Sequence, residues 1–281
     1  MKKNALLIVL LFSGVFCFGQ SHRHYTIRYK TLTDTICLST QSVMGIHIDD
    51  VGQELVHDDG TEWSFLMDLD TIYVLREPDN SNWVDLGLPS GLLWANRNVG
   101  ASAPEDYGDH FAWAETCPKS AYDWDTYSYC CSGTGSSLTK YCNKSNFGCN
   151  GYTDTLDILL SEDDAASAFW GNDARTPTIE EWQELNNNCT SVWTNQNGVN
   201  GRLFTGPNGN SLFLPAAGIR DGNGLVYAGT EGDYWSSSLE IFNPSESWYF
   251  QLNSAYANTN HFDFRDWGRT VRAVRSVNRQ K

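Results

Sequence analysis

Residues 175–185, RTPTIEEWQEL, carry the clearest structural signal in this chain of 281 residues. Pro177 suits the first turn of a helix, and Glu181 follows Thr178 by three residues, as in a capping box. An apolar stripe recurs at helical spacing and consists of Ile179, Trp182 and Leu185. The stretch therefore predicts a helix that opens at Thr176 or Thr178 and buries this stripe in a core.

The flanking sequence indicates one further helix and many short strands. Ser161 and Asp164 approximate a capping box ahead of an apolar run that ends at Trp170. Downstream, the turn sequence DGNG at 221–224 separates two strand-like runs, and both of its glycines permit positive φ. This pattern predicts a β-hairpin. Few helices, short strands and turn-rich connections together predict an α+β fold with long irregular loops.

A series of sequence blocks around this helix resembles the Fibrobacter succinogenes major paralogous domain family. The blocks are WVDLGLPSGLLWA at 83–95, NVGA at 98–101, YGDHFAWAET at 107–116, RTPTIEEW at 175–182, LPAAG at 214–218, YWSSS at 234–238 and GRTVRAVR at 268–275. They follow the family's order and cover about residues 82–276. The block at 175–182 is also similar to the corresponding helix of formylglycine-generating, sulfatase-modifying enzymes.

These families share a C-type-lectin-like fold, so the resemblance implies that fold for residues 82–277. It implies short antiparallel strands and two helices, near 161–170 and 177–187. Oxidase chemistry is not implied, because the sulfatase-modifying enzymes use a cysteine pair near the end of their fold and no cysteine follows Cys189. We expect the tryptophans of the blocks in the core, and the same is expected of Trp248 from strand alternation.

The sequence ahead of these blocks has a different texture. Residues 20–78 contain β-prone runs with alternating polar and apolar side chains, and a polar, breaker-rich stretch at 77–81 follows them. We expect a small β-rich N-terminal region over 20–78, ahead of the domain at 82–277. Its acidic turns lack the residue spacing of a calcium-binding loop.

Residues 1–19 have the order of a secretory signal peptide. Two lysines open the chain, the run 5–12 is apolar, and small or apolar residues continue to Gly19, where we expect cleavage. The apolar run is too short to span a bilayer. Cys17 leaves lipidation as an alternative, although the bulky Phe16 before it disfavours a lipoprotein signal. The pattern predicts export to the periplasm, the cell surface or the medium, with no transmembrane segment after cleavage.

The charge of the exported chain excludes several partners. The sequence has 19 basic and 34 acidic residues, and cleavage removes two lysines and no acid, which leaves a net charge of −17. A surface this negative repels phosphate backbones and anionic lipid headgroups. We therefore expect no nucleic-acid partner.

Seven cysteines remain after cleavage, and an oxidising compartment permits disulfides between them. They are Cys37, Cys117, Cys130, Cys131, Cys142, Cys149 and Cys189. The odd number leaves at least one thiol free or paired between chains. Cys142 and Cys149 lie in a loop rich in Gly and Asn that can turn back on itself, so they form the expected disulfide. A bond between Cys131 and Cys142 is the rival pairing.

Signals of catalysis are weak throughout the chain. The sequence has no H-E-x-x-H, no G-x-S-x-G and no phosphate-binding G-x-x-x-x-G-K-[ST]. The six histidines are scattered without the spacing of metal ligands. We therefore expect no enzyme activity, no metal and no cofactor.

The segment 239–267, LEIFNPSESWYFQLNSAYANTNHFDFRDW, suggests a binding surface instead. Aromatic and polar residues interleave there, as in an evolved paratope, and the segment resembles the stretch that C-type-lectin-like proteins display to ligands. The expected ligand-binding residues are Glu240, Phe242, Asn243, Glu246, Tyr256, Asn258, Asn260, His261, Asp263, Arg265 and Trp267. The prediction is a non-catalytic binding or adhesion module for a glycan or an extracellular protein. A structural surface protein, and an enzyme related to sulfatase-modifying factors, are the alternatives.

Overall fold

The computed structural model describes residues 82–276, apart from Asn172, and the backbone of six strands nearer the N-terminus. The chain divides into two compact units, Met1–Asp79 and Asn80–Lys281. The predicted signal peptide and acidic turns lie outside the described residues. Each helix in the described part is too short or too polar to cross a lipid bilayer.

The N-terminal unit is built from antiparallel strands. One pair consists of β1 (His24–Lys30) and β2 (Thr35–Gln41). A meander of four strands consists of β3 (Val43–Ile48), β4 (Gln53–His57), β5 (Glu62–Asp68) and β6 (Thr71–Val74). These strands agree with the β-rich pattern of the sequence.

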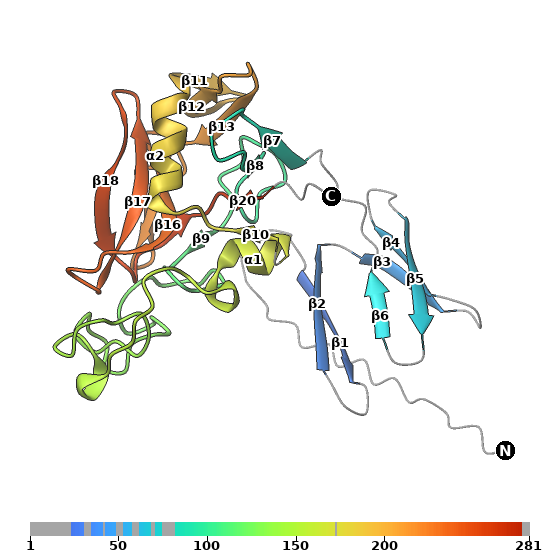
Figure 1. Ribbon diagram of the computed structural model, residues 1–281, viewed down its shortest axis with the longest axis horizontal. Helices are drawn as coiled ribbons and strands as arrows, with labels where there is room; N and C mark the ends of the chain where they lie inside the picture. Colours follow the sequence, from blue (N-terminus) through green and yellow to red (C-terminus); the bar gives the residue numbers. More distant parts are fainter. Residues whose placement is uncertain are drawn as a thin grey trace. The chain divides into compact units, whose positions relative to one another are not determined.

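The second unit is organised around a five-stranded sheet with the order β18-β17-β16-β19-β9. Its strands are β9 (His110–Phe111), β16 (Glu231–Leu239), β17 (Glu246–Asn253), β18 (Ala257–Phe264) and β19 (Arg269–Thr270). The helix α2 (Ile179–Asn188) lies against β16, β17 and β18 (Figure 1). Neighbouring strands are antiparallel except β16 and β19.

The other elements of this unit are short. They are β7 (Trp83–Asp85), β8 (Leu93–Ala95), η2 (Cys149–Gly151), η3 (Ser161–Asp163), α1 (Ala165–Trp170), β10 (Ala174–Arg175), β11 (Thr190–Gln196), β12 (Val199–Thr205), β13 (Ser211–Pro215), β14 (Ile219–Asp221), β15 (Gly224–Val226) and β20 (Val274–Arg275). They form a sheet β10-β20-β8-β7, a sheet β11-β12-β13 and the hairpin β14-β15. With two α-helices among many strands, the described unit is a β-rich α+β structure.

Local sequence signals explain both α2 and the hairpin. The Thr178 hydroxyl accepts the Glu181 N–H, and the Glu181 carboxylate accepts the Thr178 N–H, which confirms the predicted capping box. The predicted apolar stripe of α2 is buried. In the hairpin, Asp221 pairs with Gly224, and Gly222 takes a φ of 53°. Glycine adopts this left-handed conformation at little cost.

The cap of α1 differs from the prediction. The N-cap is Asp164 and not Ser161, which instead begins the short 3-10 turn η3. The buried Asp164 carboxylate accepts the Ala166 N–H at 2.8 Å and both the hydroxyl and the N–H of Thr176. One aspartate therefore starts α1 and also fixes the chain ahead of α2.

The five-stranded sheet separates two hydrophobic cores. On one face, Trp182 of α2 stacks on Phe250 with ring centroids 4.8 Å apart. On the other face, the Trp113 and Trp235 indoles are buried and donate to backbone carbonyls of the opposing segment. Core burial is thus confirmed for these tryptophans and for Trp94, whereas Trp83, which opens the first sequence block, is only half-buried against the second core. Trp248 is only half-buried at the border of the first core, so its assignment to the interior was wrong.

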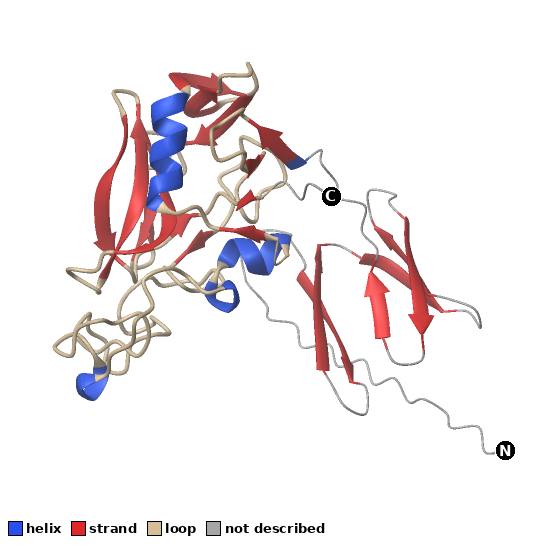
Figure 2. Cartoon of the chain, in the orientation of Figure 1, coloured by secondary structure: helices blue, strands red, loops and turns tan. Residues whose placement is uncertain are grey.

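A long connection between β9 and α1 consists almost entirely of loop (Figure 2). The predicted disulfide between Cys142 and Cys149 is wrong, because the structure joins Cys131 to Cys149, with Cα atoms 6.2 Å apart. Leu138 forms backbone bridges to Cys130 and to Gly148, which are the sequence neighbours of the two bonded cysteines. Two remote cysteines are thereby brought together. Cys142 is buried as a free thiol that donates to the Lys144 carbonyl.

Peptide mapping without reduction tests this pairing. We expect a linked peptide pair that contains Cys131 and Cys149, whereas Cys142 is alkylated only after unfolding because the fold buries its thiol. A linked pair that contains Cys142 would contradict the structure. Cys117, which is exposed, is the internal control and should be alkylated in the native protein.

Candidate functional site

The outer strand β18 displays a row of exposed side chains. Asn260, Phe262 and Phe264 are exposed, whereas His261 and Asp263 between them are half-buried. Because successive side chains of a strand point to opposite faces, the three exposed residues share one face. We call Asn260, Phe262 and Phe264 the outer row.

Two tryptophans support the rings of the outer row. Trp248 on β17 lies directly opposite Phe262, and their ring centroids are 5.1 Å apart at an angle of 79°. Trp124, from the long loop, meets the Phe264 ring at 6.1 Å and 74°. Edge-to-face pairs of this kind contribute about 0.5–1.5 kcal/mol beyond area burial. The exposed phenylalanine rings are therefore held in place by neighbouring rings.

Side chains of β18 also occupy the outward edge of the strand. The Asn260 N–H donates to Asn258 Oδ1 at 2.9 Å, and the Phe264 N–H donates to Asp263 Oδ1 at 2.8 Å. Unpaired amides at a sheet edge are a template for another strand, and local side-chain bonds compete with such pairing. The backbone N–H groups of Asn260 and Phe264 are therefore already bonded, and a partner at this edge would contact side chains instead.

The opposite face of β18 carries a stacked column of rings. His261 lies between Tyr256 and Tyr249, with ring centroids 6.5 Å and 5.5 Å away. The Arg269 guanidinium then lies 4.0 Å from the Tyr249 ring and 4.4 Å from the ring of Trp235 beneath it. A cation held against aromatic faces in a desolvated site is stabilised by about 2 kcal/mol or more.

Two aspartates flank this arginine. Arg269 donates from Nη2 to Asp263 at 2.8 Å, whereas its Nε lies 3.7 Å from Asp233, too far for a hydrogen bond. Burial raises the pKa of Asp233 to about 6, against the lowering effect of the Arg269 charge. Burial and then Arg269 lower the pKa of His261. Among the described residues, Asp233 Oδ1, Arg269 Nη1 and His261 Nε2 have no hydrogen-bond partner.

The residues that we predicted as a ligand surface do not form one surface. The exposed ones are Phe242, Tyr256 and Asn260. The half-buried ones are Asn243, Glu246, Asn258, His261, Asp263 and Trp267. The buried ones are Glu240 and Arg265. The alternation of β18 explains part of the division, because it sends Asn260 to the outer row and His261 and Asp263 to the stacked column.

Glu240 is a turn residue and was wrongly placed in the ligand surface. Its side chain is 5% exposed, and Oε1 accepts the Phe242 N–H at 2.8 Å. The Glu240 N–H also donates to the Glu246 carbonyl, which closes the turn between β16 and β17. The carboxylate therefore shapes the turn that exposes Phe242.

Arg265 was also wrongly placed in the ligand surface, because it is fully buried. Its guanidinium donates to the Tyr127 hydroxyl and to the carbonyls of Tyr141, Pro244 and Lys140, at 2.9 to 3.2 Å. The same group lies 4.9 Å from the centre of the Trp113 ring. It thus ties the end of β18 to the long loop and to the turn after β16.

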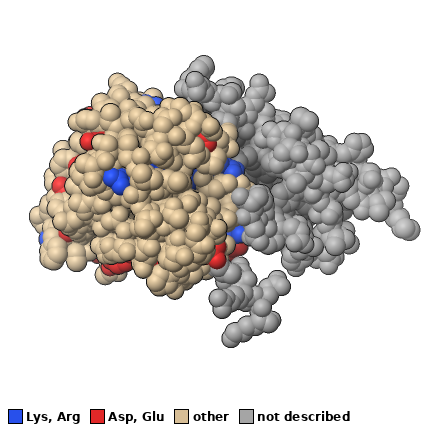
Figure 3. Space-filling view, turned by 90° about the horizontal axis from the view of Figure 1, so that it is seen from above, with Lys and Arg blue, Asp and Glu red and all other residues tan. Residues whose placement is uncertain are grey.

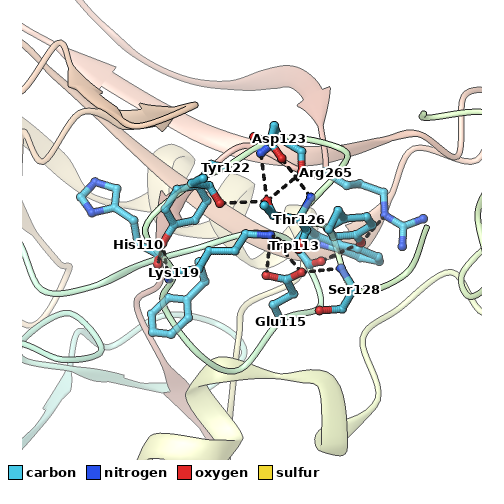
Figure 4. Close-up of polar contacts among 12 residues, drawn as sticks. His110, Trp113, Glu115, Lys119, Tyr122, Asp123, Thr126, Ser128 and Arg265 are labelled. Carbon is cyan, nitrogen blue, oxygen red and sulfur yellow. Dashed lines mark hydrogen bonds and ion pairs between the residues drawn. The ribbon is translucent and has the colours of Figure 1, made fainter. Parts of the chain in front are cut away.

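Figure 4 shows the polar network that stiffens the loop next to Arg265. Lys119 forms an ion pair with Glu115 at 2.9 Å and donates to the Thr126 carbonyl. Glu115 in turn accepts the Ser128 N–H at 2.7 Å, and Tyr122 donates to the carbonyl of His110. These bonds hold the part of the loop that carries Trp124.

Sequence reasoning missed Phe262, Phe264, Trp124 and Arg269. The signal for the first two was the alternation in residues 260–264, NHFDF, which places both phenylalanines on the face of Asn260. No local pattern announces Trp124 or Arg269, because each reaches the site through tertiary contacts.

The described part of the chain contains no group of three or more His, Cys, Asp or Glu residues arranged to hold a metal ion. A small internal cavity between Trp113, Asp163 and Trp235 has room for about one water molecule. It lies in the second core, away from the outer row. The outer row itself presents two phenylalanine rings and one side-chain amide, which suit ring stacking and hydrogen bonding.

Comparisons with protein-family models, with curated proteins and with solved structures found no match. The family resemblance thus rests on the sequence blocks at 83–275 alone.

Replacement of Arg265 tests whether this residue supports the fold. We expect Arg265→Gln to lower the free energy of unfolding by at least about 3 kcal/mol, because several buried acceptors lose their donor. Arg175→Gln is the matched control, since the Arg175 side chain is 41% exposed and pairs with Glu181 at the surface. Urea denaturation should show a loss of at most about 1 kcal/mol for the control. Equal losses for the two variants would contradict a structural role specific to Arg265.

Asp266 generates a prediction of pH dependence. This carboxyl is 3% exposed, its Oδ1 has no partner among the described residues, and burial raises its pKa to about 7. An unfolded aspartate has a pKa of about 3.9, so ionisation of Asp266 costs stability as pH rises from about 4 to about 7.

We expect Asp266→Asn to match the wild type in stability near pH 4 and to exceed it at pH 8, because the amide cannot ionise. Urea denaturation between pH 4 and pH 8 measures the difference. The control, Asp157→Asn, makes the same substitution at an exposed carboxyl. A pH-independent difference for Asp266→Asn would rule out the buried carboxyl as the cause.

Proposed function

We propose that this chain is an exported binding module with a C-type-lectin-like domain over 82–277, which recognises a glycan or protein ligand through the surface of residues 239–267. The ordered sequence blocks support the fold, and the N-terminal pattern of residues 1–19 supports export to the periplasm, cell surface or medium. The proposed module is non-catalytic. The chain's negative charge supports a ligand other than a nucleic acid. The scarcity of catalytic motifs supports binding without a cofactor.

One observation carries this proposal: exposed large apolar side chains concentrate in the proposed segment. Among the described residues they include Ile241, Phe242, Tyr256, Phe262 and Phe264. They are close in the sequence and divide between two faces, because Tyr256 stacks on His261 whereas Phe262 and Phe264 lie in the outer row. Exposed large apolar groups mark interaction sites more often when they lie together than when they are scattered. The remaining exposed apolar residues of the described unit come from several separate loops and hairpins.

The support beneath these rings favours a binding role over a loose loop. Phe262 rests against Trp248, and Tyr256 donates its hydroxyl to Gln251 at 2.7 Å. Side chains that are already ordered lose little conformational entropy when a ligand arrives. Aromatic anchors with amides beside them suit either a sugar ring or a protein surface.

Alanine substitutions test the proposal. We expect Phe262→Ala and Tyr256→Ala each to cost on the order of 2 kcal/mol of binding free energy, about a 30-fold loss of affinity. The melting temperature should fall by no more than a few degrees, because both rings are partly exposed and a lost edge-to-face contact costs about 0.5–1.5 kcal/mol. Labelled mature protein is applied to a glycan array and to an array of extracellular proteins, and affinity for the best ligand is then measured for each variant.

Tyr227→Ala provides the matched control, since Tyr227 is an exposed aromatic residue outside the segment. This variant should bind as the wild type does. Binding that survives both segment substitutions would place the ligand elsewhere. The absence of any ligand on either array would favour a structural surface protein.

A further inference from the structure

We infer that the outer row takes an uncharged polysaccharide chain, laid along β18 with its sugar rings against Phe262 and Phe264. This inference rests on the proposed function and names its ligand class. It depends on three properties of the surface: the linear arrangement of the row, its lack of charge and the occupied edge of the strand.

The outer row is linear because it follows one strand. Residues two apart on a strand are separated by about 6.6–6.8 Å, so the rings of Phe262 and Phe264 repeat along the β18 axis. Asn260 is exposed at an irregularity of the β17–β18 pairing, between Asn258 and His261, and its side-chain amide can both donate to and accept from hydroxyl groups. A chain of linked sugar rings can occupy such positions together, and several weak contacts then add their strength.

The outer row carries no charged side chain. Arg265 and Arg269, which follow β18 in the sequence, are 0% and 1% exposed, so their side chains cannot reach a ligand. The Asp263 carboxylate is engaged by the Phe264 N–H and by Arg269. Opposite Phe264 on β17, the half-buried Glu246 places an acidic side chain beside the row, which disfavours an anionic ligand.

An anionic ligand would therefore find no exposed arginine in this segment. On the face drawn in Figure 3, the described residues show no large patch of lysine and arginine side chains. The whole chain has a net charge of −15, which repels polyanions over longer distances. Lys144 approaches this segment at Phe242, where its ammonium group already donates to the Phe242 carbonyl and lies 5.7 Å from the ring. Aromatic faces with side-chain amides beside them suit neutral rings that carry hydroxyl groups.

The edge of β18 argues against a protein partner that adds a strand. The Asn258 and Asp263 side chains already accept the backbone N–H groups of Asn260 and Phe264. Recognition by main-chain pairing would have to break these bonds before it formed new ones. A polysaccharide needs only the side-chain surface, which the supporting tryptophans hold rigid.

Affinity electrophoresis tests this inference on the mature protein. Native gels contain konjac glucomannan or xyloglucan, which are uncharged, or polygalacturonate, which is anionic. We expect retardation in at least one uncharged gel and none in polygalacturonate. Phe262→Ala and Phe264→Ala should each weaken the retardation at least tenfold in apparent affinity, while Tyr227→Ala should behave as the wild type. Thermal melting of each variant confirms that the fold is retained, and whichever phenylalanine variant is folded supplies the result.

The contrary outcomes separate a failure of the neutral-ligand inference from a failure of the proposed function. Retardation by polygalacturonate that depends on Phe262 or Phe264 overturns the neutral ligand and leaves the binding module standing. Binding to an extracellular protein that depends on the same residues has the same consequence. Absence of retardation in both uncharged gels overturns the inference. If neither array yields a ligand either, the proposed function fails with it.

Discussion

The buried guanidinium of Arg265 is the contact on which the arrangement of the second unit depends. It satisfies acceptors from the Lys140–Tyr141 stretch, from Pro244 and from the Tyr127 hydroxyl, while the Trp113 ring covers it. A long loop with little regular structure is thus attached to the end of β18 through one side chain. Because a buried cation without partners would cost several kcal/mol, the loop and the strand must assemble together.

Around this contact, the sheet is built so that neighbouring residues serve different cores. Tyr234 belongs to the core under α2, and the next residue, Trp235, belongs to the core under the long loop. Tyr249 and Phe250 divide in the same way on β17. A shift of one residue in either strand would exchange the two sets of rings, so both cores enforce the register. The exposed positions of β18 depend on that register.

Features encoded by adjacent residues could be predicted from the sequence, and features that depend on remote contacts could not. The capping box of α2 and its buried stripe lie within one short segment, so local chemistry determines them. The disulfide depends on Leu138, which bridges to two other parts of the loop, and spacing along the chain gave no hint of that contact. Arg265 carries a charge and was expected at the surface, but its guanidinium is buried among backbone carbonyls and the rings of Trp113 and Tyr127. For the candidate site, which side chains of the segment share a face could not be predicted, because the orientation of each side chain depends on the pairing of β17 with β18.

The self-occupied edge of β18 has a consequence for how copies of this chain behave when crowded. An open edge strand with phenylalanines on one face is the kind of surface from which sheets grow into fibres. Here the Asn258 and Asp263 side chains accept two backbone N–H groups of β18, and these bonds compete with pairing to the same strand of a neighbouring copy. At high local concentration, each copy can then keep its aromatic surface exposed without joining its neighbours in an extended intermolecular sheet.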